Sequence, residues 1–175
     1  ARPTPPPAGA PVPRRAARAQ GLGAVTEIKP VLEAIARTTE RIHRDKGVTV
    51  KVKCKGAYKF RGEKQDFEEM MGNLIDNACK WAVKRVVVKA SLGGAAAHQG
   101  RTWLTLLVDD DGPGLPAERR ADALKRGQRL DETKPGSGLG LSIVKETAQM
   151  YGGSIELDDA ELGGLRVRLI LPAAA

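Results

Sequence analysis

An amphipathic segment over residues 64–82 is the feature that most constrains the fold of this chain. Its apolar residues recur at intervals of three and four, as they do along one face of an α-helix. That face is wide, and a wide apolar face must be buried against other elements. The segment therefore predicts a long helix lying on a hydrophobic core, with these side chains turned inward: Phe67, Met70, Met71, Leu74, Ile75, Ala78 and Ala82.

The segments on either side of this helix alternate between helical and strand-like patterns. Helical spacing predicts two more helices, over residues 28–45 and 139–150. Three helices and about five strands, several of them adjacent in sequence, favour an α+β protein. We expect a two-layer α/β sandwich in which a mixed sheet carries the helices on one face. Alternating or short apolar runs predict strands at residues 48–54, 85–92, 101–108, 154–157 and 165–171.

The first 23 residues differ in composition from the rest of the chain. They hold six of the eleven prolines, together with Ala, Gly and Arg, and contain no acidic residue. Such a mixture buries too little apolar surface to fold. We expect a linker or disordered tail over residues 1–23 and one domain over residues 24–175, since an apolar fraction of 41% suffices to fill one core.

The formal net charge of +8 raises the question of a nucleic-acid partner. The aromatic residues, 3% of the chain, do not interleave with the basic ones as stacking platforms do. We therefore expect no nucleic-acid partner.

No apolar run approaches the roughly 18 residues that cross a bilayer. We therefore expect this piece of the protein to be soluble. Cys54 and Cys79 lack CxxC spacing, so we expect two reduced thiols in the cytoplasm.

Polar side chains follow one side of the predicted 64–82 helix. Asn73 and Asn77 are four residues apart, and Lys80 and Trp81 follow Asn77 by three and four. These residues border the apolar face, so they line the edge of the core where a ligand can enter. An Asn carbonyl is a hard, neutral oxygen ligand that suits Mg²⁺, which keeps phosphate oxygens and waters as its other ligands. Ordinary polar residues at a helix boundary remain the alternative.

A run of three aspartates and two glycines ends the predicted strand at 101–108. Because side chains alternate along a strand, Asp110 points away from Asp109 and Asp111. An Asp fixed at a strand end can accept a hydrogen bond from an exocyclic amine, while Gly112 and Gly114 let a flat ring approach the backbone. An acidic turn is the alternative. A calcium loop is excluded because the ligand spacing of an EF-hand is missing.

A glycine-rich loop leads directly into the last predicted helix. Gly136, Gly138 and Gly140 let successive backbone N–H groups converge, and the helix N-terminus adds partial positive charge, so the loop can hold phosphates. It has neither the spacing of a P-loop nor that of a dinucleotide fold. Cations in the stretch before it could fold over a triphosphate, or could be ordinary solvated charges: Arg126, Arg129 and Lys134.

The three motifs, in this order and spacing, resemble the ATP-binding domain of sensor histidine kinases, within the superfamily of gyrase, Hsp90, histidine kinase and MutL (GHKL). The string GNLIDNACKWA is similar to the N box, DDDGPGLP to the first glycine box and PGSGLGLSIVKETAQMYGG to the second. RGQRLDETKPG and LGGLRVRL are similar in particular to PhoQ-type kinases. The resemblance covers about residues 27–172, and it implies a Bergerat-type fold with a flexible ATP lid.

The resemblance also implies roles for individual residues. Asn77 would coordinate Mg²⁺, Asp110 would hold the adenine amine and Trp81 would stack beside the nucleotide, in place of the usual Tyr. We take Asn73, Lys80 and Arg129 as the catalytic residues, on the triphosphate side. Lys134 stands where an Arg is common, which removes a bidentate phosphate contact. The remaining nucleotide contacts would come from the glycine boxes: Gly112, Gly114, Ser137, Gly138, Leu139 and Gly140.

The residue four positions before Asn77 bears on the reaction. ATPases of the superfamily place there a Glu that activates water, whereas this chain has Asn73, which cannot act as a base. Glu69, one turn earlier, is expected to be a surface residue. The γ-phosphoryl group would then survive until a histidine attacks it, as a kinase requires. A GHKL-type ATPase and a non-catalytic nucleotide-sensing module remain the alternatives.

The acceptor histidine is expected on another domain. The family places it in a string H-[ED]-x-x-[TN]-P, which this sequence lacks, and neither His43 nor His98 has that context. By resemblance, the partners are the dimerisation and phosphoacceptor domain of the same kinase and a response regulator. The full-length protein would be a homodimeric inner-membrane sensor, of which this chain is a fragment, and the cofactors would be ATP and Mg²⁺.

Overall fold

Five strands with alternating apolar and polar side chains form the central sheet of the computed structural model, which describes residues 23–93, 101–125 and 140–174. Along β5, for example, Leu104, Leu106 and Val108 enter the core, whereas Thr105 and Leu107 are only partly buried. The strands of this sheet are β2 (Thr49–Cys54), β4 (Arg85–Leu92), β5 (Trp103–Asp110), β6 (Ser154–Asp159) and β7 (Leu165–Pro172).

The sheet is mixed, with the strand order β2-β4-β5-β7-β6. β2 and β4 are parallel and pair Val50 with Val86, while the other three neighbouring pairs are antiparallel. Parallel neighbours need a crossover connection. Here the chain crosses through α3 (Lys64–Trp81), the helix that the sequence predicts most strongly. The predicted mixed sheet of about five strands is confirmed.

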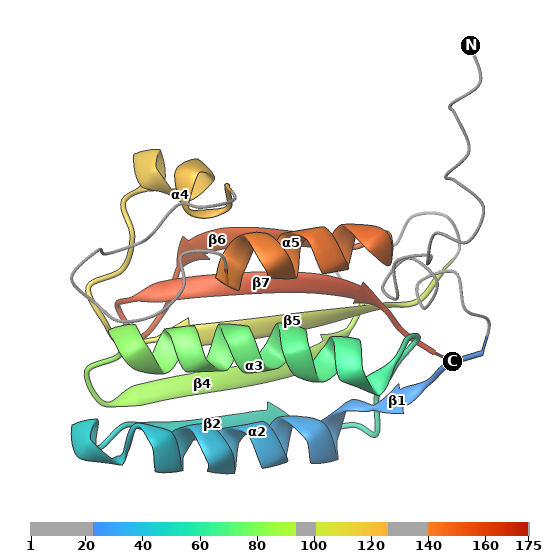
Figure 1. The fold of residues 1–175 in the computed structure, drawn as a ribbon, viewed down its shortest axis with the longest axis horizontal. Coiled ribbons are helices and arrows are strands. Elements are labelled where there is room, and N and C mark those ends of the chain that lie inside the picture. The colour runs from blue at the N-terminus through green and yellow to red at the C-terminus, as the bar shows by residue number, and fades with distance from the viewer. Residues whose placement is uncertain (1–22, 94–100, 126–139, 175) are drawn as a thin grey trace, which may run out of the picture.

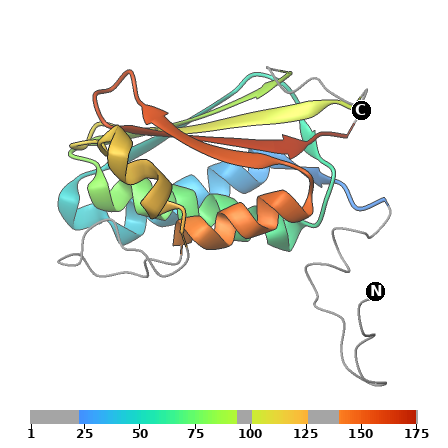
Figure 2. The same ribbon diagram turned by 90° about the horizontal axis from the view of Figure 1, so that it is seen from above.

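Three helices cover one face of the sheet, as the sequence predicts. Figure 2 shows α2 (Ile28–Ile42), α3 and α5 (Gly140–Met150) on the same side of the strands. α3 lies in the middle and packs against both α2 and α5 (Figure 1). Its apolar face is fully buried, with Phe67, Met71 and Ile75 at 0% exposure. Among the described residues, no helix is both long and apolar enough to cross a membrane.

Several element boundaries differ from the sequence prediction. The first helix ends at Ile42, and a 3₁₀ turn (Arg44–Lys46) follows it before Gly47, whose φ of 69° only glycine adopts readily. β5 extends to Asp110 because Asp109 and Asp110 still pair with β4. Three short elements were not predicted: β1 (Thr26–Glu27), its partner β3 (Lys59–Phe60) and the helix α4 (Ala117–Ala123).

Candidate functional site

Three segments that are far apart in the sequence meet at one end of the molecule. Figure 1 shows the C-terminal end of α3, the end of β5 and the start of α5 together at its left side. The first two are tied by direct contact: a Cβ placed on Gly112 would lie 2.3 Å from the carbonyl oxygen of Trp81. The fold therefore brings the Asn-bearing helix, the aspartate run and the beginning of the last helix to one place.

Asp110 lies at this end with a buried carboxylate. Its residue is 3% exposed, and its Oδ1 accepts hydrogen bonds from the backbone N–H of Gly112 at 2.9 Å and of Leu165 at 3.3 Å. Burial raises the pKa of Asp110 above its ordinary value, although the two N–H groups act in the opposite direction. A carboxylate held by backbone on one oxygen is well placed to accept a hydrogen bond from a ligand on the other.

The neighbours of Asp110 point elsewhere, as strand alternation predicts. Asp109, on the opposite face of the sheet, receives two hydrogen bonds of 2.8 Å from the guanidinium of Arg166. Asp111, just past the strand, accepts from the backbone N–H of Val83 at 2.8 Å and of Lys84 at 3.1 Å. Only Asp110, of the three, lies on the helix-covered face.

Two glycines leave no room for a side chain around Asp110. At Gly112 the position of a Cβ is taken by the Trp81 carbonyl, so the end of α3 requires this glycine, a reason the sequence did not suggest. At Gly164 a Cβ would meet Asp110 Oδ1 at 2.1 Å and its backbone oxygen at 2.5 Å. Gly114 has a φ of 74°. Gly164, in the turn between β6 and β7, and Leu165, the first residue of β7, are site residues that sequence reasoning missed.

Asn73 and Asn77 lie on the side of α3 that faces α5. Asp66 shares this side, because it precedes them by seven and eleven residues. Its carboxylate accepts a hydrogen bond of 2.5 Å from the hydroxyl of Tyr151, which directly follows α5. Since α3 and α5 run in opposite directions (Figure 1), Asn77 lies towards the start of α5. Both asparagines are half-buried, at the edge of the core as predicted.

Lys80 and Trp81 occupy the last turn of α3 and are also half-buried. The ammonium of Lys80 lies 3.3 Å from Asp76 Oδ2, on the side towards α2. Glu69, expected at the surface, is half-buried. Gly140 begins α5. Several predicted nucleotide contacts lie outside the described residues: Arg129, Lys134, Ser137, Gly138 and Leu139.

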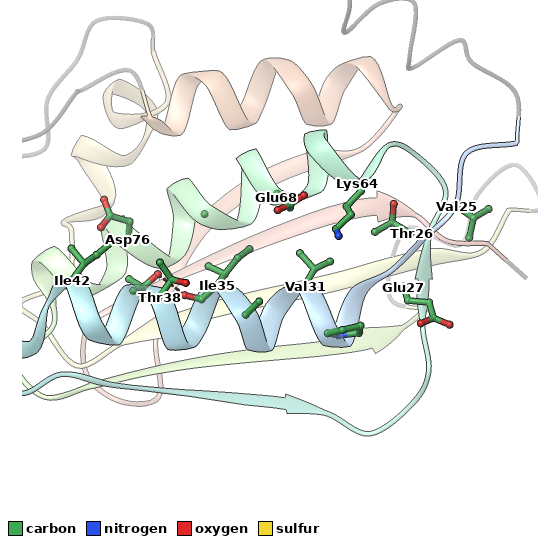
Figure 3. Close-up of a pocket in the computed structure, with 14 residues that line it drawn as sticks. Val25, Thr26, Glu27, Val31, Ile35, Thr38, Ile42, Lys64, Glu68 and Asp76 are labelled. Carbon is green, nitrogen blue, oxygen red and sulfur yellow. Dashed lines mark hydrogen bonds between the residues drawn. The ribbon is translucent and has the colours of Figure 1, made fainter.

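A cavity of about 730 Å³ lies along the seam between α2 and α3 (Figure 3). Apolar residues of α2, among them Val31 and Ile35, form one wall, and Lys64, Glu68 and Asp76 of α3 lie opposite. None of the predicted nucleotide residues lines it. The cavity is therefore distinct from the end of the molecule where Asn77 and Asp110 lie.

Both cysteines are buried and free. Burial, with a smaller contribution from Asp76, raises the pKa of Cys79 to about 12. The thiolate form, which is the reactive one, is therefore strongly disfavoured at neutral pH. Cys79 acts as an apolar side chain of α3 in the core.

Comparisons with known proteins identify the family of this chain. A family model described as "Histidine kinase-, DNA gyrase B-, and HSP90-like ATPase" matches residues 62–175. The virulence sensor histidine kinase PhoQ of Salmonella typhimurium is 35% identical over 143 residues, which cover 82% of this chain and 28% of PhoQ. The chain thus spans less than a third of that relative.

Solved structures give the same result. The mycobacterial sensor histidine kinase MprB has a TM-score of 0.72 and 26% identity, over 87% of this chain and 98% of that one. The ATP-binding domain of PrrB from Mycobacterium tuberculosis has a TM-score of 0.67, with the same identity and coverage. The chain therefore belongs to the family of histidine kinase-, DNA gyrase B- and HSP90-like ATPases, in which its similar relatives are sensor histidine kinases.

Proposed function

We propose that this domain binds Mg·ATP at the end where α3, β5 and α5 meet, and presents the γ-phosphate to a histidine of another domain. The observation that carries the proposal is the buried Asp110 carboxylate, held by backbone N–H groups beside the last turn of α3. Burying a carboxylate costs free energy unless a protein group or a bound ligand pairs with it. Its position beside the last turn of α3, in a chain of this family, supports recognition of adenine.

The adenine end of the nucleotide would rest on Asp110 and Trp81. The exocyclic amine donates a hydrogen bond to the carboxylate, which must be ionised to accept it. The indole of Trp81 stacks beside the ring. Gly112 and Gly114 keep side chains away from this place, since one has no room for a Cβ and the other has a left-handed φ.

The triphosphate would lie between α3 and the start of α5. Asn77 offers one neutral carboxamide oxygen, which fits Mg²⁺ because this ion is held mainly by phosphate oxygens and water. When bound, the ion neutralises negative charge on the phosphates. Asn73 and Lys80 support the same side. Backbone N–H groups at Ser137, Gly138, Leu139 and Gly140, with Arg129 and Lys134, would complete the phosphate site.

Transfer to a histidine is favoured over hydrolysis because of Asn73. A carboxamide cannot take a proton from water, so this position supplies no general base. An imidazole nitrogen of a separate phosphoacceptor domain would attack the γ-phosphorus, the bond to the bridging oxygen would break and ADP would leave. The whole protein would be a homodimeric inner-membrane sensor kinase that phosphorylates a response regulator, like the sensor kinases it resembles.

Calorimetric titration with ATP, with and without Mg²⁺, tests the site. We expect binding that Mg²⁺ strengthens in the unmodified domain, and loss of the Mg²⁺-dependent part in Asn77→Ala. Glu68→Ala, an exposed position on the other side of α3, is the matched control and should bind normally. Equal Mg²⁺-dependent affinity for the domain and for Asn77→Ala would refute the assignment.

Incubation with labelled ATP and a separate histidine-bearing phosphoacceptor domain tests the reaction. Phosphohistidine on that domain is the expected product. Steady release of phosphate by this chain alone, abolished in Asn73→Ala, would instead identify an ATPase. ATP binding without either product would identify a nucleotide-sensing module.

A further inference from the structure

One carboxylate in the seam between α2 and α3 has two partners from different elements. Asp76 Oδ1 lies 2.8 Å from Nε2 of His43, and its Oδ2 lies 3.3 Å from the ammonium of Lys80. A carboxylate only accepts hydrogen bonds, so His43 carries a proton on Nε2. The side chains of His43, Asp76 and Lys80 are 12%, 38% and 31% exposed, so the group is partly shielded from water.

The backbone holds this group in place. His43 caps the C-terminus of α2, where its N–H donates to the carbonyl of Thr39. Three residues later, the ammonium of Lys46 donates to the carbonyl oxygens of Cys79 at 2.9 Å and Lys80 at 2.6 Å. The end of α2 is thereby fastened to the last turn of α3, which fixes the distance between His43 and Asp76.

Asp76 lies on the opposite side of Lys80 from the asparagines. Figure 3 shows Asp76 at the Ile42 end of the cavity between α2 and α3. At 100° per residue, Lys80 lies between Asp76 and Asn77 around the helix axis. Its long side chain can therefore turn towards α2, where Asp76 holds it now, or towards the side of Asn77.

We propose that Asp76 is a positioning residue that restrains Lys80, and that His43 sets the strength of this restraint. The inference rests on the proposed function, in which Lys80 contacts the triphosphate. The ammonium leaves Asp76 only for a ligand that offers more negative charge than one carboxylate. The hydrogen bond from His43 draws charge to Oδ1 and weakens the hold of Oδ2 on Lys80. The end of α2 thus tunes the affinity for phosphate without touching the nucleotide.

The first test is Asp76→Asn, which keeps shape and removes charge. We expect ATP to bind about twofold to fivefold more tightly, the range that an exposed ion pair contributes, while affinity for adenosine stays unchanged. A purely structural role would change both affinities. Unchanged ATP affinity in a variant with the wild-type melting temperature would overturn the inference.

The second test replaces His43 in two ways. In His43→Phe, Asp76 loses its donor and holds Lys80 more strongly, so ATP should bind more weakly by a similar factor. His43→Gln retains an N–H donor and should restore most of the affinity. His43→Phe should have no effect on ATP affinity in the Asp76→Asn background. Equal weakening by Phe and Gln would contradict the role given to the histidine.

The third test separates restraint of Lys80 from a direct effect of charge. In the Lys80→Met background, Asp76→Asn should leave ATP affinity unchanged. If the same gain persists there, Asp76 repels the phosphates by itself and the inference is wrong. If the domain binds adenosine but no substitution of Lys80 changes the affinity for ATP, the inference fails while the adenine site stands. Failure to bind ATP at all would overturn the proposed function as well.

Discussion

Asp110 differs from Asp109 and Asp111 in what surrounds its carboxylate. Asp109 meets the guanidinium of Arg166, and Asp111 meets two backbone N–H groups of the connection between α3 and β4. Asp110 also receives two N–H groups, yet burial outweighs them and raises its pKa. The pKa values of the neighbours Asp110 and Asp111 thus shift in opposite directions, because their carboxylates lie in different surroundings.

The raised pKa of Asp110 predicts how adenosine binding depends on pH. Only the ionised carboxylate accepts the amine, so affinity should fall on acidification, beginning at a higher pH than an ordinary Asp, near pKa 3.9, would give. Adenosine is the suitable ligand because it has no titrating phosphate. Calorimetry across pH 4–8 checks this, with inosine, which lacks the amine, as the non-binding control. Constant affinity down to the titration range of an ordinary Asp would contradict the prediction.

Asp110→Asn should separate stability from binding. A raised folded pKa means that the ionised group costs stability above that pKa, and that the cost disappears below the unfolded pKa. At pH 7 the neutral amide should therefore increase the free energy of unfolding, by about 0.5–2 kcal/mol, as substitutions at functional sites commonly do. Its carbonyl can still accept from Gly112 and Leu165. Urea unfolding should show the gain, and adenosine binding should be lost; a less stable variant would be evidence against this account.

At the scale of elements, the connection between α3 and β4 depends on the side chain that directly follows β5. Asp111 accepts from Val83 and Lys84, which α3 can no longer satisfy once the helix has ended. Burial acts to raise the pKa of Asp111, but the backbone N–H groups of this connection outweigh it and lower the pKa. The end of the helix and the end of the strand are thereby locked together.

Asp111→Ala should lower the free energy of unfolding by about 1–2 kcal/mol, because two N–H groups lose their acceptor. Since the folded pKa is lowered, this contribution is present at neutral pH and is lost as the pH falls through that lowered pKa. Urea unfolding at pH 7 gives the measurement. Asp122→Ala, which removes only an exposed pair with Lys125, is the matched control and should change little.

The turn between β6 and β7 should be sensitive to the addition of a single methyl group. In Gly164→Ala the added Cβ collides with Asp110 and with the N–H of Gly112, neither of which can move cheaply. We expect a loss of about 1–3 kcal/mol in stability together with loss of adenosine binding. Gly72→Ala is the control, since nothing lies within 4 Å of its Cβ and an alanine favours the helix. Equal stabilities of the two variants would show that the turn does not constrain Asp110.

Elements with a strong periodic pattern were predictable, and those defined by distant contacts were not. β4 was predicted residue for residue over Arg85–Leu92 because alternation and turn signals bound it. α4 escaped because it lies in a stretch rich in Gly, Pro and charge and buries only Ala123. The direction of Asp110 followed from strand alternation, whereas its contact with Gly164 joins residues more than fifty positions apart. The roles of the site residues stay predictions.

At the scale of the whole molecule, nucleotide binding should appear as added stability. A ligand that binds only the folded state stabilises it by about 2.7 kcal/mol at a concentration one hundred times the Kd. Mg·ATP should therefore raise the melting temperature of this domain, and Asn77→Ala should lose the Mg²⁺-dependent part of the increase. Scanning calorimetry with ATP, with and without Mg²⁺, measures it. A melting temperature that does not change at saturating Mg·ATP would mean that the folded state has no such site.

The route of the chain through α3 has a consequence for local opening. Within the described part of the chain, β2 joins the sheet only through its parallel pairing with β4, and the connection between them contains α3. The helix that packs on β2 is α2, and α2 packs in turn against α3. When α3 detaches, α2 and this edge strand lose their support, so the three should open as one cooperative unit. A nucleotide that binds to α3 should then slow amide hydrogen exchange in residues 49–54, although it contacts none of them. The edge strand β2 would report, at a distance, whether a nucleotide occupies α3.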